Sequence, residues 1–184
     1  MHRHREEIRV FFSIPIPKNL SEYFFEHALG ISMGNPRKIT PKNNMHIRAF
    51  FLGNIELNSL EKLKLMVAEE LQNIVSFTLQ FQAFRFAPPN NPYMLWATFH
   101  HSESFLRLHQ SLARASQTTP QQKKLIPHIT LARFKRLPKE MVNVTLIEPF
   151  EYTLKIIEVG LYQSILKPEG VKYVKLERFI LQTD

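Results

Sequence analysis

Two histidines open short apolar segments that lie far apart in the sequence and share one pattern. His46 begins His-Ile-Arg-Ala-Phe-Phe-Leu, and His128 begins His-Ile-Thr-Leu-Ala-Arg-Phe. Both segments have strand composition, and side chains alternate between the two faces of a strand. His46 and Arg48 therefore share one face of the first segment, while His128 and Thr130 share one face of the second. Each strand thus presents an imidazole beside a second polar group.

A pair of imidazoles flanking one cleft is suited to opening a cyclic phosphodiester. One group must take a proton from the attacking water or hydroxyl, and another must protonate the departing ribose oxygen. Imidazole, with an unperturbed pKa of about 6.5, can do either near neutral pH. A hydroxyl such as that of Thr130 or a guanidinium such as that of Arg48 can hold the charge on the non-bridging oxygens. The alternative is that both histidines only satisfy hydrogen bonds at the ends of their strands.

The elements expected around the histidine segments follow one order in both halves of the chain. The first half predicts a strand over 8–14, a helix over 20–29 closed by Gly30, a polar loop over 37–45, and the strand 46–52 stopped by Gly53. The second half predicts a strand over 94–99, a helix from Ser102 to Ala115, a polar loop over 117–124, and the strand 128–134. This repetition indicates a pseudo-duplicated α+β fold.

Further elements lie between and after the two halves. Asn58 followed by Glu61 resembles a capping box and predicts a helix running to Ile74, and residues 77–83 alternate like a strand with one wet face. Two β-rich segments, 150–161 and 171–181, are joined by a turn over 167–170. No linker divides the chain, so residues 1–184 are expected to form a single domain.

Composition closes several kinds of chemistry. The chain has no cysteine, which excludes a disulfide scaffold, a thiolate zinc site, an iron–sulfur cluster and a cysteine nucleophile. It also lacks an HExxH metal motif, a glycine-rich phosphate loop and a G-x-S-x-G elbow, so no required metal, ATP-driven ligation or serine hydrolysis is expected. The formal net charge of +8 favours a polyanionic partner such as nucleic acid or an acidic membrane surface.

Hydropathy patterning bears on location. The apolar stretch after the N-terminus is short and broken by Pro15 and Pro17, and nothing approaches the roughly 18 apolar residues of a membrane span. These features predict a soluble cytoplasmic protein with no membrane partner, and a monomer is the simplest expectation for it. Most of the 15 phenylalanines, together with Trp96, are expected in the core because they occupy regularly spaced apolar positions.

The two histidine segments also carry a resemblance. Residues 43–53 and 127–134 resemble the paired H-x-T/S signatures of the two-histidine (2H) phosphoesterases, and are most similar to the RNA 2′,3′-cyclic phosphodiesterase family, also called 2′-5′ RNA ligases. Residues 9–15 look like that family's opening strand, 95–97 like its central strand, and 161–173 like its closing segment. The resemblance therefore extends over nearly the whole chain.

This resemblance implies a fold and an activity. The fold would be bilobal, an α+β pair of antiparallel sheets related by a pseudo-two-fold, with outer helices and a central groove. The activity would be hydrolysis of a terminal 2′,3′-cyclic phosphate on RNA to a 2′-phosphate, without metal or other cofactor, and the reverse reaction would join RNA ends. His46 would be the general acid and His128 the base, and the reverse order of these two roles stays open. Thr130 would hold a phosphate oxygen, and Arg133 would bind phosphate or position the strand.

The first motif departs from the family pattern. Arg48 stands where the family has threonine or serine, and Phe50 stands where many members have arginine. Because Arg48 shares the face of His46, its charged fork can replace a phosphate-binding hydroxyl. Alternatively, Arg48 forms a salt bridge at the rim of the groove and weakens or redirects catalysis.

Basic residues border both histidines, as a groove that receives RNA phosphates would require. They are Arg37, Lys38 and Lys42 before His46, Lys123 and Lys124 before His128, and Lys135 and Arg136 after the second strand. The resemblance also makes Tyr162 and Tyr173 candidates for base stacking. Two alternatives to the RNA phosphodiesterase remain open. One is a degenerate, non-catalytic RNA-binding module, and the other is a 2H phosphodiesterase for 2′-5′ oligonucleotides or small cyclic phosphates.

Overall fold

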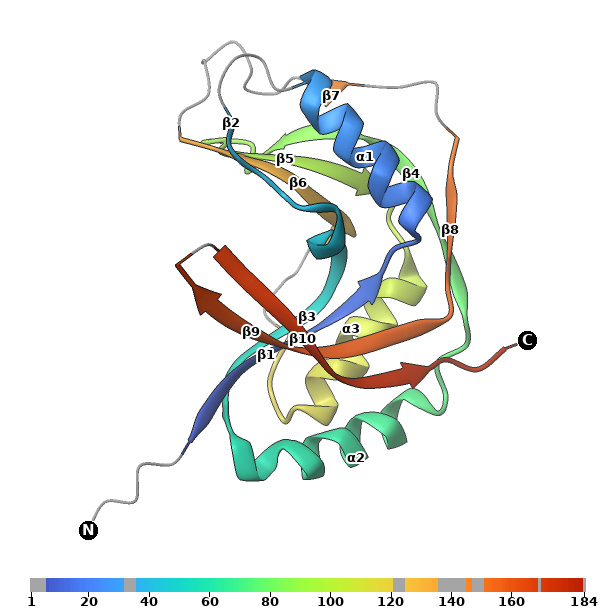
Figure 1. Ribbon diagram of the computed structural model, residues 1–184. Helices are drawn as coiled ribbons and strands as arrows, with labels where there is room; N and C mark the ends of the chain where they lie inside the picture. The colour runs from blue at the N-terminus through green and yellow to red at the C-terminus, as the bar shows by residue number, and fades with distance from the viewer. Residues whose placement is uncertain are drawn as a thin grey trace.

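The structure is a computed structural model that describes residues 6–31, 36–120, 125–135, 145–146, 151–168 and 170–183 (Figure 1). Its strands are β1 (Glu7–Pro15), β2 (Pro36–Ile39), β3 (His46–Glu56), β4 (Phe77–Ala87), β5 (Met94–Phe99), β6 (His128–Phe134), β7 (Thr145–Leu146), β8 (Thr153–Ile156), β9 (Glu158–Lys167) and β10 (Gly170–Ile180). Its helices are α1 (Lys18–Ile31), α2 (Leu60–Leu71) and α3 (Glu103–Ala115), with 3₁₀ turns at Lys42–Asn44 and Leu57–Ser59.

The strands form one strongly curled antiparallel sheet in the order β10-β9-β1-β3-β6-β5-β4-β7. β3 and β6 meet at its centre, where Ile47 lies opposite Ile129. One lobe consists of β10, β9, β1 and β3, and the other consists of β6, β5, β4 and β7. These are the two lobes that the sequence predicts. Figure 1 shows the sheet curving around an open side, with the β9–β10 hairpin facing β2, β5 and β6. The expected bilobal α+β fold is confirmed.

The helices cover the outer face of the curled sheet. α1 follows β1 but packs on the other lobe, where the Phe24 ring lies 5.8 Å from the rings of Phe81 and Phe84. α3 follows β5 and contacts β3, and α2 packs on α3. Each lobe is therefore covered by a helix that follows the other lobe's strand, which ties the two halves together. Ser102 caps α3 as expected, since its hydroxyl accepts a hydrogen bond from the Phe105 backbone N–H at 3.2 Å.

Two segments differ from the sequence prediction because sheet pairing overrides local pattern. Residues 36–39 lie in the stretch expected as a polar loop, yet they form β2 against β6, with Lys38 opposite Arg133. The sequence predicts one strand over 150–161. The structure instead has two strands there. β8 ends at Ile156 and pairs with β4, and β9 begins at Glu158 and pairs with β1. It thus passes from one lobe to the other near Ile157.

Three element ends also differ. Gly53 does not stop β3, which continues to Glu56. Gly53 takes a φ of +92° where the register with β1 shifts, a conformation that glycine adopts readily. Ser59, rather than Asn58, is the N-cap of α2, and no side-chain cap bond forms there because a 3₁₀ turn precedes the helix. α1 also runs one residue beyond Gly30.

Candidate active site

The central strand pairing sets the histidine motifs side by side. Ile47 and Ile129 face each other across β3 and β6, and both are fully buried. Residues opposite each other in an antiparallel pair share one face, so their neighbours project from the other face. His46, Arg48, His128 and Thr130 therefore share the inner face of the curled sheet, with His46 beside Thr130 and Arg48 beside His128. The structure brings together four of the five predicted site residues in this way.

Matching β-bulges bring further side chains to the same face. Three residues after His46, Ala49 has no partner on β1, because Ser13 pairs with Arg48 and Phe12 pairs with Phe50. Three residues after His128, Leu131 likewise has no partner on β5, because Trp96 pairs with Thr130 and Leu95 with Ala132. An extra residue shifts the alternation of side chains by one position. The pseudo-two-fold thus extends to the bulges that follow the motifs.

The second bulge explains the place of Arg133. Counting from Thr130 by strict alternation would set Arg133 on the outer face, but the extra residue returns it to the inner face, opposite Met94 on β5. Its Nη1 donates to the Met94 sulfur at 3.0 Å. In the first motif the equivalent position is Phe51, which is 38% exposed. Phe50, which strict alternation would place on the face of His46, is instead buried in the core at 4% exposure.

Both histidines are held in the same tautomer by the same local contact. Nδ1 of His46 lies 2.8 Å from the Asn44 carbonyl oxygen, and Nδ1 of His128 lies 2.7 Å from the Ile126 carbonyl oxygen. A carbonyl oxygen can only accept, so each Nδ1 must carry the hydrogen. The lone pair of each neutral ring is then at Nε2, the atom that can exchange a proton with a substrate.

Aromatic rings fix the two imidazoles differently. The His46 ring lies 5.2 Å from Phe11 and 5.3 Å from Tyr173, which meets it edge-on at 88°. The His128 ring stacks on Trp96 with centroids 3.8 Å apart and planes at 19°. Trp96 therefore lies on the inner face rather than only in the core, as its register opposite Thr130 requires. Sequence reasoning missed Trp96 because its apolar strand looks fully buried.

Both imidazoles favour the neutral form in the free protein. Burial lowers the pKa of His46 to about 4, against a smaller opposing effect of the Asn44 hydrogen bond, and the charges of Arg48 and His128 lower it further. Burial and the charge of Arg48 also lower the pKa of His128. The histidines are close enough for one to affect the titration of the other. A bound phosphodiester anion would oppose these effects by favouring an imidazolium.

Arg48 is exposed on the inner face of the sheet and forms no ion pair with a carboxylate among the described residues. Partial burial lowers its pKa, and so do the positive charges of Arg133 and Arg9, while Tyr173 opposes them. Arg133 and Arg9 therefore each lie close enough to Arg48 for their charges to act on it. The expected alternative of a salt bridge at the rim is not what the described part of the chain shows.

A hollow of about 340 Å³ adjoins His46 on the side of β9 and β10. Its lining includes Phe11, Lys18, Lys42, Asn44, Tyr162 and Tyr173. Asn44 connects His46 to β10. Its side-chain amide donates to the Val171 carbonyl of β10 at 3.2 Å, and its own backbone carbonyl accepts from His46. Sequence reasoning did not single out Asn44, since a backbone acceptor leaves no mark on residue type. Both tyrosines named as stacking candidates border this hollow.

The other basic residues are less fully placed. Lys42 borders the hollow and pairs with Glu26 at 3.5 Å, while Lys38 on β2 and Lys135 after β6 are exposed. Lys123, Lys124 and Arg136 lie outside the described residues, as does the side chain of Arg37. Positive charge therefore borders the hollow beside His46.

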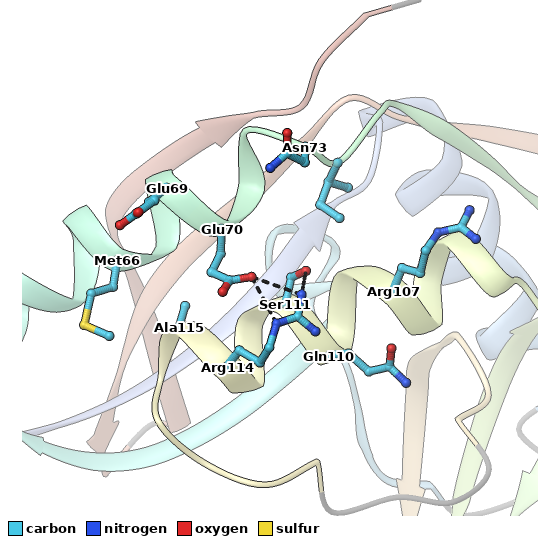
Figure 2. Close-up of a pocket in the computed structure, with 10 residues that line it drawn as sticks. Met66, Glu69, Glu70, Asn73, Arg107, Gln110, Ser111, Arg114 and Ala115 are labelled. Atoms are coloured by element: carbon cyan, nitrogen blue, oxygen red, sulfur yellow. Dashed lines mark hydrogen bonds and ion pairs between the residues drawn. The ribbon is translucent and has the colours of Figure 1, made fainter.

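A separate hollow of about 610 Å³ lies between α2 and α3 (Figure 2). Figure 2 shows Arg114 turned toward Glu70 and Ser111, and its guanidinium donates to the Glu70 carboxylate at 3.0 and 3.2 Å. This ion pair joins the two helices. The hollow lies outside the inner face of the sheet and contains none of the histidine motif residues, so its polar groups serve helix packing rather than the chemistry of the groove.

The part of the chain that the structure describes contains neither a metal-binding cluster of side chains nor a helix that could span a membrane. Its residues contain no group of three or more His, Cys, Asp or Glu side chains arranged to hold a metal ion. None of the helices in the described ranges combines the length and the apolar character that crossing a bilayer requires.

Comparison with known proteins identifies the family. Residues 38–165 match the model of the 2′-5′ RNA ligase superfamily, and the chain belongs to that superfamily. Three similar proteins are each named RNA 2′,3′-cyclic phosphodiesterase. The one from Methanocaldococcus jannaschii is 25% identical over 90% of this chain and 96% of its own length. The one from Thermus thermophilus is 25% identical over 95% and 91%, and the one from Thermotoga maritima 23% over 72% and 73%.

Solved structures show the same fold. A Thermus thermophilus protein superposes with a TM-score of 0.79 at 24% identity, covering 96% of this chain and 100% of that one. Escherichia coli LigT in its apo form gives a TM-score of 0.80 at 21% identity, covering 96% and 99%. The curled sheet with three helices is therefore that of the LigT-like proteins.

Proposed function

We propose that this protein is an RNA 2′,3′-cyclic phosphodiesterase that opens a terminal cyclic phosphate to a 2′-phosphate by acid and base catalysis from His46 and His128. The observation that carries the proposal is the pairing of Ile47 with Ile129, which sets both motifs on one face of the sheet. The names of the three similar proteins support the same reaction. RNA with a cyclic phosphate end is the proposed substrate, and no cofactor is required.

The reaction moves two protons and exchanges one bond at phosphorus. His128 Nε2 takes a proton from water as the water oxygen attacks phosphorus, and the bond from phosphorus to the ribose O3′ breaks. His46 Nε2 gives its proton to O3′, which leaves as a hydroxyl. The product keeps the phosphate on O2′. Attack by the 5′-hydroxyl of a second RNA, in place of water, would form a 2′-5′ bond.

Cationic and hydroxyl groups next to the histidines would hold the phosphate. Thr130 lies beside His46 and Arg48 beside His128, so each imidazole has a group for a non-bridging oxygen next to it on the adjacent strand. Arg133 reaches the same face through the bulge at Leu131. The phosphodiester anion would raise the lowered pKa of His46, so that binding of substrate favours the protonated acid that the reaction needs.

Other members of the fold bind the corresponding chemical groups. Escherichia coli LigT has been solved in complexes with 3′-AMP and with phosphate, at TM-scores of 0.78 and 0.77 to this chain. We infer by analogy that the groove beside His46 and His128 receives the terminal nucleotide. The aromatic side chains of Tyr162 and Tyr173 in the adjoining hollow are candidates to contact its base.

The test is turnover of an RNA oligomer that ends in a 2′,3′-cyclic phosphate, with EDTA present. The product is identified as a 2′-phosphate or 3′-phosphate, and ligated dimers are scored in the same gel. His46→Ala and His128→Ala should each lower kcat at least about 100-fold, the usual contribution of a general acid or base. His101→Ala, which removes an exposed histidine paired with Glu103, is the matched control and should retain activity. Binding of RNA without turnover would instead support a non-catalytic module.

A further inference from the structure

Phe51 carries two guanidinium groups on the inner face of the sheet. The Arg9 Cζ lies 5.1 Å from the Phe51 ring centroid, and the Arg48 Cζ lies 5.7 Å from it. Arg48 also lies 6.0 Å from the Phe11 ring. Because both guanidinium carbons lie within 6 Å of the Phe51 centroid, they also lie close to each other. Cation–π attraction to the same Phe51 ring restrains both guanidinium groups, which reduces the freedom each would lose on binding a ligand.

Strand register accounts for this arrangement. Ser13 lies opposite Arg48 and Phe11 lies opposite Phe51, so this face of β1 also carries Arg9, two residues before Phe11. The bulge at Ala49 is what turns Phe51 toward this face. Arg9 lies four residues from Ser13, a separation of roughly 13 Å along an extended strand. Arg9 thus extends the line of positive charge away from the histidines.

Among the described residues, no ion pair with an acidic side chain balances these two cations. Within the described ranges neither Arg9 nor Arg48 forms an ion pair, and both are exposed. Two like charges drawn onto one ring repel each other. Such an arrangement is relieved by an anion bound between the two guanidinium groups, because charge-assisted hydrogen bonds to phosphate are among the strongest available to arginine.

The place of this pair relative to the histidines defines which anion fits. Arg48 lies beside His128 on the adjacent strand, next to the proposed position of the reacting phosphate. Arg9 lies on β1, farther from the histidines than Arg48 is. An RNA chain carries its next phosphate one nucleotide from the cyclic end. A mononucleotide has no phosphate to offer there.

We propose that Arg9 and Arg48, held on Phe51, form a second phosphate site that binds the internal phosphodiester next to the cyclic end of an RNA chain. The proposal rests on the proposed function. The second site would make the enzyme prefer an oligonucleotide with a cyclic end over a nucleoside 2′,3′-cyclic phosphate. Arg48 is shared between the two sites, whereas Arg9 belongs to the second site alone.

The test compares kcat/KM for a nucleoside 2′,3′-cyclic phosphate with that for a dinucleotide that has the same cyclic end. Wild type should prefer the dinucleotide at least tenfold, and Arg9→Gln should lower this preference about tenfold or more. A dinucleotide whose internal linkage is an uncharged methylphosphonate should lose the preference in wild type, and Arg9→Gln should then have no further effect on it. Arg107→Gln, which removes an exposed arginine bonded only to Ser104 in the described structure, is the charge-matched control.

Several results would overturn the proposal. An unchanged substrate ratio in Arg9→Gln would eliminate the second site, and an equal loss on both substrates would assign Arg9 to the reacting phosphate or to folding. Full preference for the methylphosphonate would show that the base or sugar is recognised instead. If wild type turned over neither substrate, the proposed function would fail separately. Calorimetric binding of the dinucleotide 2′-phosphate, with and without the methylphosphonate, would then decide the second site on its own.

Discussion

His109 on α3 donates a hydrogen bond from Nδ1 to the carbonyl oxygen of Ala49 at 2.7 Å. Ala49 is the bulged residue that follows the first histidine motif, and no residue of β1 lies opposite it. In the second motif the equivalent carbonyl, that of Leu131, accepts from the backbone N–H of Thr40 at 2.8 Å. The carbonyl of the bulged residue thus accepts a hydrogen bond from a side chain in one lobe and from the backbone next to β2 in the other. α3 therefore supports the bulge that sets Arg48 and Phe51 on the inner face.

Replacement of His109 should test this support. His109 is only 6% exposed and its ring packs edge-on against Phe50 at 5.1 Å, so His109→Leu would keep much of the packing but leave the Ala49 carbonyl buried without a donor. We expect the free energy of unfolding in urea to fall by about 1–3 kcal/mol. His109→Asn, which can offer a side-chain N–H near the Nδ1 position, should lose less. Equal losses in the two variants would mean that only the volume of the ring matters.

Stability should also depend on pH through His46. Its pKa is about 4 in the folded protein and about 6.5 when unfolded, so the unfolded chain binds more protons between these values. The contribution of His46 is therefore fully present above pH 6.5, and the free energy of unfolding decreases as pH falls toward 4. Urea unfolding at pH 6.5, 5.5 and 4.5 should give a shallower slope for His46→Gln than for wild type. Parallel slopes would contradict the lowered pKa.

The sequence was informative about the site because strand alternation is a short-range property. Ile47 and Ile129 are apolar and are expected to face the core. By alternation, the polar residues on either side of each isoleucine must face away from the core. The expected order of elements, repeated in both halves, also predicts two lobes. These features depend only on neighbours along the chain, which is why they could be predicted.

Other features depend on pairing between distant segments. The two bulges place Phe50 and Arg133 on the faces opposite to those that strict alternation would give, and nothing in the residue types of Ala49 and Leu131 marks them as extra residues. β2 forms because β6 has backbone groups left over where its pairing with β3 ends, so its strand character comes from β6 rather than from its own polar sequence. Arg9 was missed for the same reason, since its proximity to Arg48 follows from the shifted register.

Placing at position 48 the threonine that the resemblance to the 2H phosphoesterases implies tests the role of the arginine there. Arg48→Thr removes a charge that lowers the pKa of both His46 and His128, so NMR titration should show both imidazole pKa values rise. It should also weaken RNA binding and reduce the slope of log Kd against log salt by about 0.7 for each phosphate that the variant no longer binds. Arg107→Gln is the control for a general loss of charge. An unchanged salt slope would mean that Arg48 contacts no phosphate.

The roles of the two histidines can be separated with a substrate in which sulfur replaces the O3′ leaving atom. A thiolate leaves without being protonated, so it needs no general acid, whereas attack by water still needs a base. With His46 as acid, His46→Ala should recover at least tenfold of its lost rate on the sulfur substrate, while His128→Ala should stay impaired by the usual factor of about 100 or more. The pKa of His46 is about 4 in the free protein, so its imidazole is neutral at pH 7 and can act as the acid only if the bound phosphate anion raises that pKa. Recovery of His128→Ala instead would exchange the two roles and leave His46, with its strongly lowered pKa, as the base that accepts the proton of water.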